Sequence, residues 1–514
     1  MSNHNKNNGI YKSVAAVFFI SMFCRVFGFL RGVVISWQFD AGDTDAYFMA
    51  VKIFNIFTLL FGSMWTTSYT PLYTQVYSED ETRKRADRLT SNLLNLLLLA
   101  ALALTLLCEI FAEPICRFIA TGFTGEKLAL TVKMTRVVMP ALPLFGLYYF
   151  FSAVLNAQKK FKIVEAATMF VGLGVVLSVL FLTDAIGSMS MAVGTLLAYF
   201  LQLLLLLPSI VRSFRYEPVL TLRESRTREF FRLLAPSAIG VAAAEINSVI
   251  DSALASTLSE GSLSALEYAQ RINTFATSLM VMPIVTVMFT KFSEYVADRE
   301  KEGFSVTLRN GMEALGVICI PILTLVAVSC QDIIRIVYQR GAFQEEIVQL
   351  SSTALFFYII GLVFFGFKTL LNRAFYAHKN TKTPMITGFI YIGCNILFNF
   401  ILIKPMGVGG LALGNSIALL VATVVMIAAY VKKYGKWNTE GTLREFSLIL
   451  LGAGLCGAVY LLLRSVLSSN LYLRFFIPCA AGVAVYALFA RVCRVRQFME
   501  LWNMLISKFI KKRQ

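Results

Sequence analysis

Charged side chains and histidines are scarce in this chain. Asp, Glu, Lys and Arg together make up 15% of its 514 residues, and the only histidines are His4 and His378. The two histidines are remote in sequence and both fall in expected loops, so we do not expect a histidine-based metal or catalytic site. We find no Walker-type phosphate loop and no nucleophile with a neighbouring base in the sequence. We therefore expect neither an ATP-binding pump nor an enzyme.

Paired cysteines are also missing. The chain has nine cysteines, none of them in a CxxC pair, and all lie in or beside apolar runs. Small buried hydrophobic side chains account for them better than a disulfide or metal framework does.

Long apolar runs dominate the sequence instead. Hydrophobic residues make up 57% of the chain, and its mean hydropathy is +0.69. A soluble domain does not need so many apolar runs of about 20 residues, the length of a helix that crosses a bilayer. The runs allow about 14 helical spans. The sequence therefore predicts an all-α polytopic membrane protein.

The basic charge balance fits this topology. The net charge is +17, and the cations gather in the loops after even-numbered spans, which the positive-inside rule places in the cytoplasm. We therefore expect both chain ends in the cytoplasm and no nucleic-acid partner. The basic C-terminal segment, residues 491–514, has apolar residues at helical spacing. It suits a helix on anionic membrane lipid, or a stabilising tail without a function of its own.

The second half of the chain echoes the first at an offset of 219 residues. At this offset Gly42 aligns with Gly261 and Lys52 with Arg271. A shift of six spans preserves orientation, so we expect two six-helix lobes related by a parallel pseudo-two-fold repeat, a transporter architecture with the site between the halves. The alternative is chance similarity between hydrophobic helices. The expected regions are 1–212 (spans 1–6), 213–433 (a linker and spans 7–12) and 434–514 (spans 13–14 and the basic tail).

Four of the cations that interrupt apolar runs are the main functional candidates: Arg25 and Arg31 in span 1, Lys52 in span 2 and Arg271 in span 8. An arginine at bilayer depth costs roughly 2.5–3.5 kcal/mol, so it is kept where it faces a cavity or a partner inside a helix bundle. Clustered cations in a low-dielectric cavity favour an anion, and the planar guanidinium suits a phosphate or pyrophosphate.

Acids lie within reach of two of these cations. Asp45 and Lys52 are seven residues apart and share a helix face, and Glu267 lies one turn before Arg271. Either pair could be self-satisfied and structural, whereas span 1 holds no acid for Arg25 or Arg31. We take all six side chains as candidate substrate-binding residues.

A second set of polar residues lies in spans 7, 11 and 12. Their carboxylate, amide and hydroxyl oxygens are ligands that a hard cation such as Na⁺ needs, so we take them as a candidate Na⁺ site. Ordinary hydrogen bonding between helices is the alternative. The set consists of Asp251, Asn395, Asn399, Asn415 and Ser416.

Several motifs resemble the lipid II flippase family (MurJ, formerly MviN) of the multidrug/oligosaccharidyl-lipid/polysaccharide exporter superfamily. They are SMFCRVFGFLRGVVI and DTDAYFMAVKIFNIF near the start, SALEYAQRI in span 8, and NRAFYAHKNTKTP with CNILFNFILIKPMGVGGLALGNSIA in spans 10–12. The resemblance implies two lobes around a central cavity, with spans 13 and 14 forming a groove for a lipid tail. It also implies that Arg25, Arg31 and Arg271 hold the lipid pyrophosphate, with Asp45 the acid at the start of span 2.

The resemblance extends to the sodium site and has one departure. The oxygen-bearing set falls where some members of the family place a sodium ion. Family members often carry an arginine pair and an AEGAF-like stretch in span 2, whereas this chain has Thr58, Leu59 and then FGSMWTTSYTP. One cavity arginine and one glutamate are thus missing, and Lys52 could compensate.

The combined expectation is a monomeric flippase of the bacterial cytoplasmic membrane. It would move an undecaprenyl-pyrophosphate-linked peptidoglycan precursor, lipid II, by alternating access. The alternatives are a flippase for another polyprenyl-linked oligosaccharide, and an ion-coupled small-molecule antiporter of the same superfamily. An antiporter would need a smaller cavity centred on acids rather than arginines.

Overall fold

The computed structural model describes residues 2–62, 64–79, 84–467 and 470–511, and this part of the chain is built of helices without strands. It forms two compact units. Unit 1 contains Met1–Ser264 and the short segment Arg340–Phe343, and unit 2 contains Ala265–Gln339 and Gln344–Gln514. The chain passes from unit 1 to unit 2 within the first turn of helix α12.

Unit 1 holds the first half of the helices. They are α1 (Ser2–Gln38), α2 (Ala41–Thr58), the 3₁₀ turn η1 (Leu59–Phe61), α3 (Met64–Glu79), α4 (Lys84–Ile110), α5 (Ala112–Ile119), α6 (Gly125–Val138), α7 (Ala141–Ala157), α8 (Phe161–Ala167), α9 (Phe170–Ile186), α10 (Met189–Val211) and α11 (Ser225–Ser256). Helix α1 packs on α8 and α9, and α2 packs on α6, α7 and α11.

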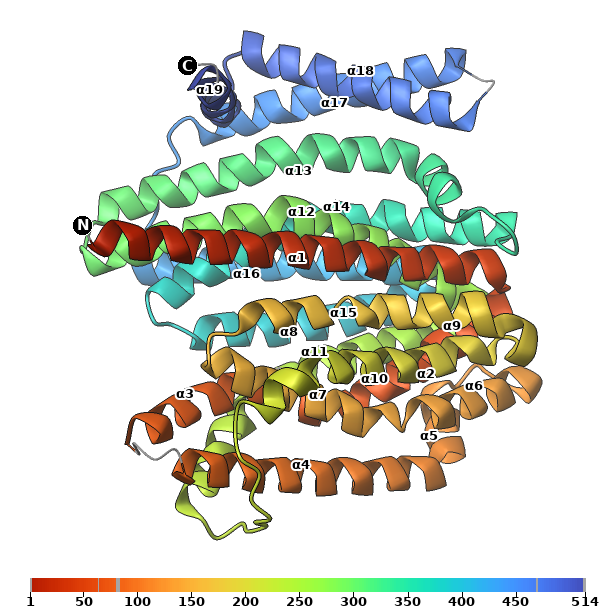
Figure 1. The fold of residues 1–514 in the computed structure, drawn as a ribbon. Helices are drawn as coiled ribbons and strands as arrows, with labels where there is room; N and C mark the ends of the chain where they lie inside the picture. Colours follow the sequence, from red (N-terminus) through yellow and green to blue (C-terminus); the bar gives the residue numbers. More distant parts are fainter. Residues whose placement is uncertain (1, 63, 80–83, 468–469, 512–514) are drawn as a thin grey trace. The chain divides into compact units, whose positions relative to one another are not determined.

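Unit 2 holds the remaining helices. They are α12 (Ser262–Ala297, from Ala265 onward), α13 (Lys301–Tyr338), α14 (Glu345–Ala377), α15 (Lys382–Met406), α16 (Val408–Tyr434), α17 (Thr442–Val466), α18 (Leu471–Val492) and α19 (Arg496–Lys511). Helix α16 packs along both α14 and α15, and α17 and α18 pack on each other and on α13. Figure 1 shows α17 and α18 side by side, with α19 turned away from their common direction.

Most of the expected spans appear as long apolar helices. Eleven helices of the described residues are long and apolar enough to cross a membrane, and the pair α6 and α7, bent by 42°, makes up a twelfth. The other two expected spans correspond to α2 with η1 and α3, and to α11. Helix α2 falls short because it carries Asp43, Asp45 and Lys52 within 18 residues. The all-α polytopic prediction is confirmed.

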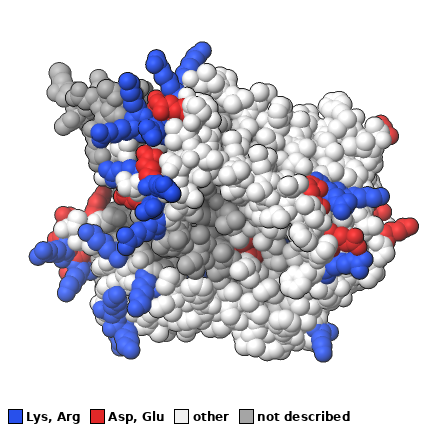
Figure 2. All heavy atoms as spheres, turned by 90° about the horizontal axis from the view of Figure 1, so that it is seen from below, with Lys and Arg blue, Asp and Glu red and all other residues white. Residues whose placement is uncertain are grey.

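Charged side chains are confined mainly to the helix ends. On the face drawn in Figure 2, Lys and Arg gather at two opposite ends, and uncharged residues dominate the band between them. Many large apolar side chains remain exposed, among them Leu106, Phe181 and Leu462. An exposed apolar band bounded by charge is typical of a protein surrounded by lipid.

Small residues bring α9 and α10 into close contact. A Cβ atom added to Gly174 would lie 2.5 Å from the Cα atom of Ala198, and one added to Gly194 would lie 2.8 Å from the Cα atom of Val175. Inside lipid the hydrophobic effect does not drive helices together. Close backbone packing of this kind is therefore a main source of helix association.

We expect Gly174→Leu to force α9 and α10 apart and to destabilise the protein by about 1–3 kcal/mol or more, as overpacking does. Thermal unfolding in detergent checks this. Gly393→Leu is the matched control, because nothing lies within 4 Å of its added Cβ atom. Equal melting temperatures for the two variants would contradict the close α9–α10 packing.

Candidate functional site

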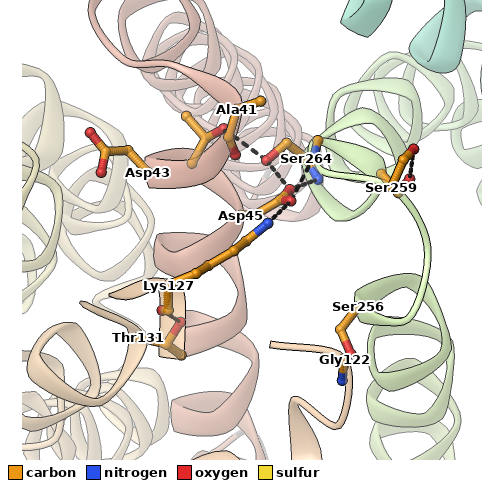
Figure 3. Close-up of polar contacts among 12 residues, drawn as sticks. Ala41, Asp43, Asp45, Gly122, Lys127, Thr131, Ser256, Ser259 and Ser264 are labelled. Carbon is orange, nitrogen blue, oxygen red and sulfur yellow. Dashed lines mark hydrogen bonds and ion pairs between the residues drawn. The ribbon is translucent and has the colours of Figure 1, made fainter. Parts of the chain in front are cut away.

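Asp45, in the second turn of α2, forms the centre of a buried polar network. Its side chain is 1% exposed. One carboxylate oxygen accepts hydrogen bonds from Lys127 Nζ at 2.7 Å and from the Gly261 backbone N–H at 2.8 Å. The other accepts from the Ser264 backbone N–H at 2.8 Å and from Ser264 Oγ at 2.7 Å (Figure 3). Four donors thus compensate one buried negative charge.

The two backbone donors belong to the start of α12. The first N–H groups of a helix have no partner within the helix, and its N-terminus carries partial positive charge. Gly261, with φ +83°, turns the chain into α12 in the left-handed region that glycine tolerates. Asp45 therefore caps α12 from another helix. Ser264 Oγ also lies 2.8 Å from Thr44 Oγ1, within hydrogen-bond distance, which fixes the same turn against α2.

Lys127 supplies the balancing charge from the first turn of α6. Its side chain is 21% exposed, and its Nζ also lies 4.4 Å from the centre of the Phe123 ring. The turn before α6 is held as well, since the Gly122 N–H donates to Ser256 Oγ at the end of α11 at 3.2 Å. The network thus joins α2, α6, the end of α11 and the first turn of α12 (Figure 3).

One expected pairing is wrong. From the sequence, Asp45 was a candidate acid for neutralising Lys52, but its carboxylate is bound to Lys127 instead. Seven residues of spacing place Asp45 and Lys52 on one face of α2, yet about 10 Å apart along its axis. Lys52 Nζ reaches across to α11 and donates to Ser248 Oγ at 3.1 Å.

Arg31 faces α2 from α1. The half-buried guanidinium lies 5.8 Å from the centre of the Tyr47 ring, and Tyr47 Oη is hydrogen-bonded to Thr195 Oγ1 at 2.9 Å. Arg31 Nε is buried without a hydrogen-bond partner among the described residues. Arg25, six residues earlier on α1, is exposed.

The candidate substrate-binding residues from the second half of the chain lie in unit 2. Glu267 and Arg271 are one turn apart on α12, and both are half-buried. Each unit therefore carries membrane-depth cations, Arg31 and Lys52 in unit 1 and Arg271 in unit 2. A shared anion cavity between the halves stays a prediction, as does the division of the chain into regions 1–212, 213–433 and 434–514.

The candidate sodium ligands are divided between the two units. Asp251 lies on α11 in unit 1, three residues after Ser248, while the other four lie on α15 and α16 in unit 2. On these helices Asn399 Nδ2 donates to Asn395 Oδ1 at 2.6 Å, and both residues are fully buried. Asn415 Oδ1 accepts from Tyr391 Oη at 3.0 Å.

Ser416 completes this group and donates through Oγ to the Phe357 backbone carbonyl at 2.6 Å. The oxygens of the set have the chemistry that Na⁺ requires, but those of Asn395 and Asn415 accept protein hydrogen bonds in this arrangement. A sodium ion would have to displace these hydrogen bonds, so Na⁺ binding stays a prediction.

Unit 2 contains two further charged clusters that were not predicted from the sequence. Fully buried Asp332 on α13 pairs with Arg464 at 2.8 Å and Arg474 at 2.6 Å, which lie on either side of the α17–α18 turn. Buried Glu313 pairs with Arg496 at the start of α19. Both acids interrupt an apolar helix, which is the signal that could have revealed them.

Glu313 and a second acid fix the start of α19. Glu445 accepts from the Arg496 backbone N–H at 3.0 Å. Hydrogen bonding to Glu313 raises the pKa of Arg496 above its usual value, so this guanidinium stays charged. The side chains of residues 504–514 lie outside the described residues, so the expected contact of the tail with anionic lipid stays a prediction.

We expect Asp45→Asn to destabilise the protein by about 3–5 kcal/mol, because it leaves the Lys127 charge without its partner and places an amide N–H₂ among donors. Thermal unfolding of Asp45→Asn, Lys127→Met and the double variant gives the coupling between the two side chains. Lys133→Met, at an exposed position of the same helix, is the control. An Asp45→Asn protein as stable as the wild type would contradict the buried network.

Comparison with known proteins extends along nearly the whole chain. The family model described as "Lipid II flippase MurJ" matches residues 38–482. A Thermotoga maritima protein described as "Probable lipid II flippase MurJ" is 28% identical over 94% of this chain and 96% of its own length.

Solved structures show the same fold. The structure titled "Lipid II flippase MurJ, inward closed conformation" has a TM-score of 0.81 and 25% identity, and the match covers 93% of this chain and 98% of that one. An inward-facing multidrug resistance MATE family transporter of the MOP superfamily has a TM-score of 0.67 at 15% identity, over 85% of this chain and 98% of the other, and shows the fold alone. On the match over residues 38–482, this chain belongs to the lipid II flippase MurJ family.

Proposed function

We propose that this chain is a lipid II flippase of the bacterial cytoplasmic membrane, which carries the undecaprenyl-pyrophosphate-linked precursor of peptidoglycan to the outer leaflet for cell-wall synthesis. Membership of the family over residues 38–482 supports the assignment. So does the likeness, at a TM-score of 0.81, to a structure whose title names that activity.

Within the chain, the proposal rests on the surroundings of Arg31. No carboxylate among the described residues forms an ion pair with it, and its described neighbour is the uncharged ring of Tyr47. A guanidinium placed among apolar helices costs roughly 2.5–3.5 kcal/mol. A diphosphate that accepts charge-assisted hydrogen bonds would offset this cost when the substrate is bound.

Movement would follow alternating access of the two halves. The positive-inside pattern supports cytoplasmic termini, which puts the start of α2, and with it the Asp45 network, at the outer ends of the helices.

The surface of the α17–α18 hairpin suits the lipid tail of the substrate. One face of the hairpin packs on α13, while Leu451, Leu462 and Phe476 are more than half exposed. Apolar side chains open to the bilayer suit a polyprenyl chain that stays in lipid while the headgroup crosses. We further propose that the protein acts as a monomer in contact with anionic lipid.

A flippase for another polyprenyl-linked oligosaccharide is the second candidate, because the same cations would hold its diphosphate. The MATE family neighbour supports a transporter fold but not an antiporter site. Membrane-depth arginines favour an anionic cargo over the cationic drugs that acid-centred cavities suit.

Depletion of the protein from its host, followed by analysis of lipid-linked precursors, tests the substrate. We expect lipid II to accumulate on the cytoplasmic side and the wild-type gene to restore its delivery. Normal delivery of lipid II, with another lipid-linked glycan accumulating, would overturn the lipid II assignment and favour the second candidate.

We expect Arg31→Met to lower the rate of lipid II translocation by about tenfold or more, since a hydrogen bond to a charged group contributes about 1.5–3 kcal/mol. Translocation of fluorescent lipid II by the purified protein in liposomes measures this. Lys133→Met removes an exposed charge from α6 and is the control. A folded Arg31→Met protein with wild-type rate would count against the anion-binding role.

A further inference from the structure

Lys368 is a membrane-depth cation that none of the interactions above employs. It lies nine residues before the end of α14, which is roughly 14 Å along the helix axis. Its side chain is half-buried. No carboxylate among the described residues forms an ion pair with it. A lysine stem spans only part of the distance to the helix end, so simple extension toward water does not account for this charge.

The described partner of Lys368 is an aromatic ring. Its Nζ lies 4.5 Å from the centre of the Tyr391 ring on α15. Tyr391 is held in turn, because its Oη donates to Asn415 Oδ1 on α16 at 3.0 Å. Helices α14 and α15 each pack along α16 but touch one another at few places. The cation–π interaction is therefore one of the few contacts between α14 and α15, and it fixes Lys368 Nζ at a defined position.

A polar atom without a partner accompanies the cation. Asn372 is one turn after Lys368 and so on the same face of α14. Its Oδ1 atom is buried, with no hydrogen-bond partner among the described residues. A buried acceptor without a donor is costly, and a ring face offsets only part of the cost of burying an ammonium group. Among the described residues, the Lys368 ammonium group thus lacks an anionic oxygen as a partner, and Asn372 Oδ1 lacks a hydrogen-bond donor.

We propose that Lys368 and Asn372 form a further substrate-binding site in unit 2, in which Lys368 contacts the diphosphate of the lipid-linked cargo and Asn372 accepts a hydrogen bond from its sugar. Tyr391 is a positioning residue, which holds the ammonium group through its ring. This inference rests on the proposed function, because it takes a polyprenyl diphosphate glycolipid as the ligand.

Binding to the full-length protein in nanodiscs of phosphatidylcholine alone tests the cation. Undecaprenyl pyrophosphate, undecaprenol and lipid II are the probes. We expect K368M to bind undecaprenyl pyrophosphate about tenfold or more weakly than the wild type, the loss typical of a hydrogen bond to a charged group. Undecaprenol binding should not change, and K368R should keep most of the affinity.

Two more variants separate the roles of the neighbours. N372L should weaken the binding of lipid II and leave undecaprenyl pyrophosphate unaffected, because only lipid II carries the sugar. Y391F keeps the ring but loses the bond to Asn415, so it should keep most of the affinity, whereas Y391L should resemble K368M. K404M removes an exposed charge from the end of α15 and is the control for net charge. K368Q replaces K368M if the latter does not fold.

The outcomes distinguish this inference from the proposed function. A wild-type preference for undecaprenyl pyrophosphate over undecaprenol that persists in K368M and K368Q would overturn this inference alone. A wild-type protein that shows no such preference would overturn the proposed function, and this inference with it.

Discussion

The structure of unit 1 depends on the burial of one carboxylate. Asp45 is 1% exposed, and a carboxylate in such a position is tolerated only when several donors replace the water it has lost. Here the donors come from an ammonium group, a hydroxyl and two backbone N–H groups. Because these donors come from two distant parts of the chain, satisfying the charge also fixes where α6 and the first turn of α12 lie against α2.

The same requirement is met differently at other buried acids. Asp332 is surrounded by two arginines and the Tyr460 hydroxyl, and Glu313 by Arg496 and the Thr442 hydroxyl. In both cases the cations come from α17–α19, the helices that follow the repeat. Buried acids on α13 therefore attach the C-terminal helices to the rest of unit 2. The membrane-depth cations Arg31 and Lys368, in contrast, have uncharged rings as neighbours. This difference supports our proposal that Arg31 and Lys368 bind the cargo, whereas the buried acids hold the fold.

The sequence predicted the helices better than the contacts. Long apolar runs determined the spans, because backbone hydrogen bonds in lipid leave few alternatives to a helix. Span 2 was expected as one segment, but the structure divides it into α2, η1 and α3 near Gly62. The Asp45 pairing failed because spacing on one helix says nothing of Lys127, which lies 82 residues away. The 219-residue offset held the missing clue, since it aligns Asp45 with Ser264, its actual partner.

The backbone donors at the start of α12 determine which kinds of mutation can reveal the importance of this segment. Two of the four donors to Asp45 are backbone N–H groups, which every residue except proline carries. Scanning this segment with alanine would leave both backbone donors in place and would report only the strain of a side chain at Gly261 and the loss of Ser264 Oγ. Such a scan would therefore understate the contribution of the main chain. Proline scanning or single-residue insertion would reveal a dependence that resides in the main chain.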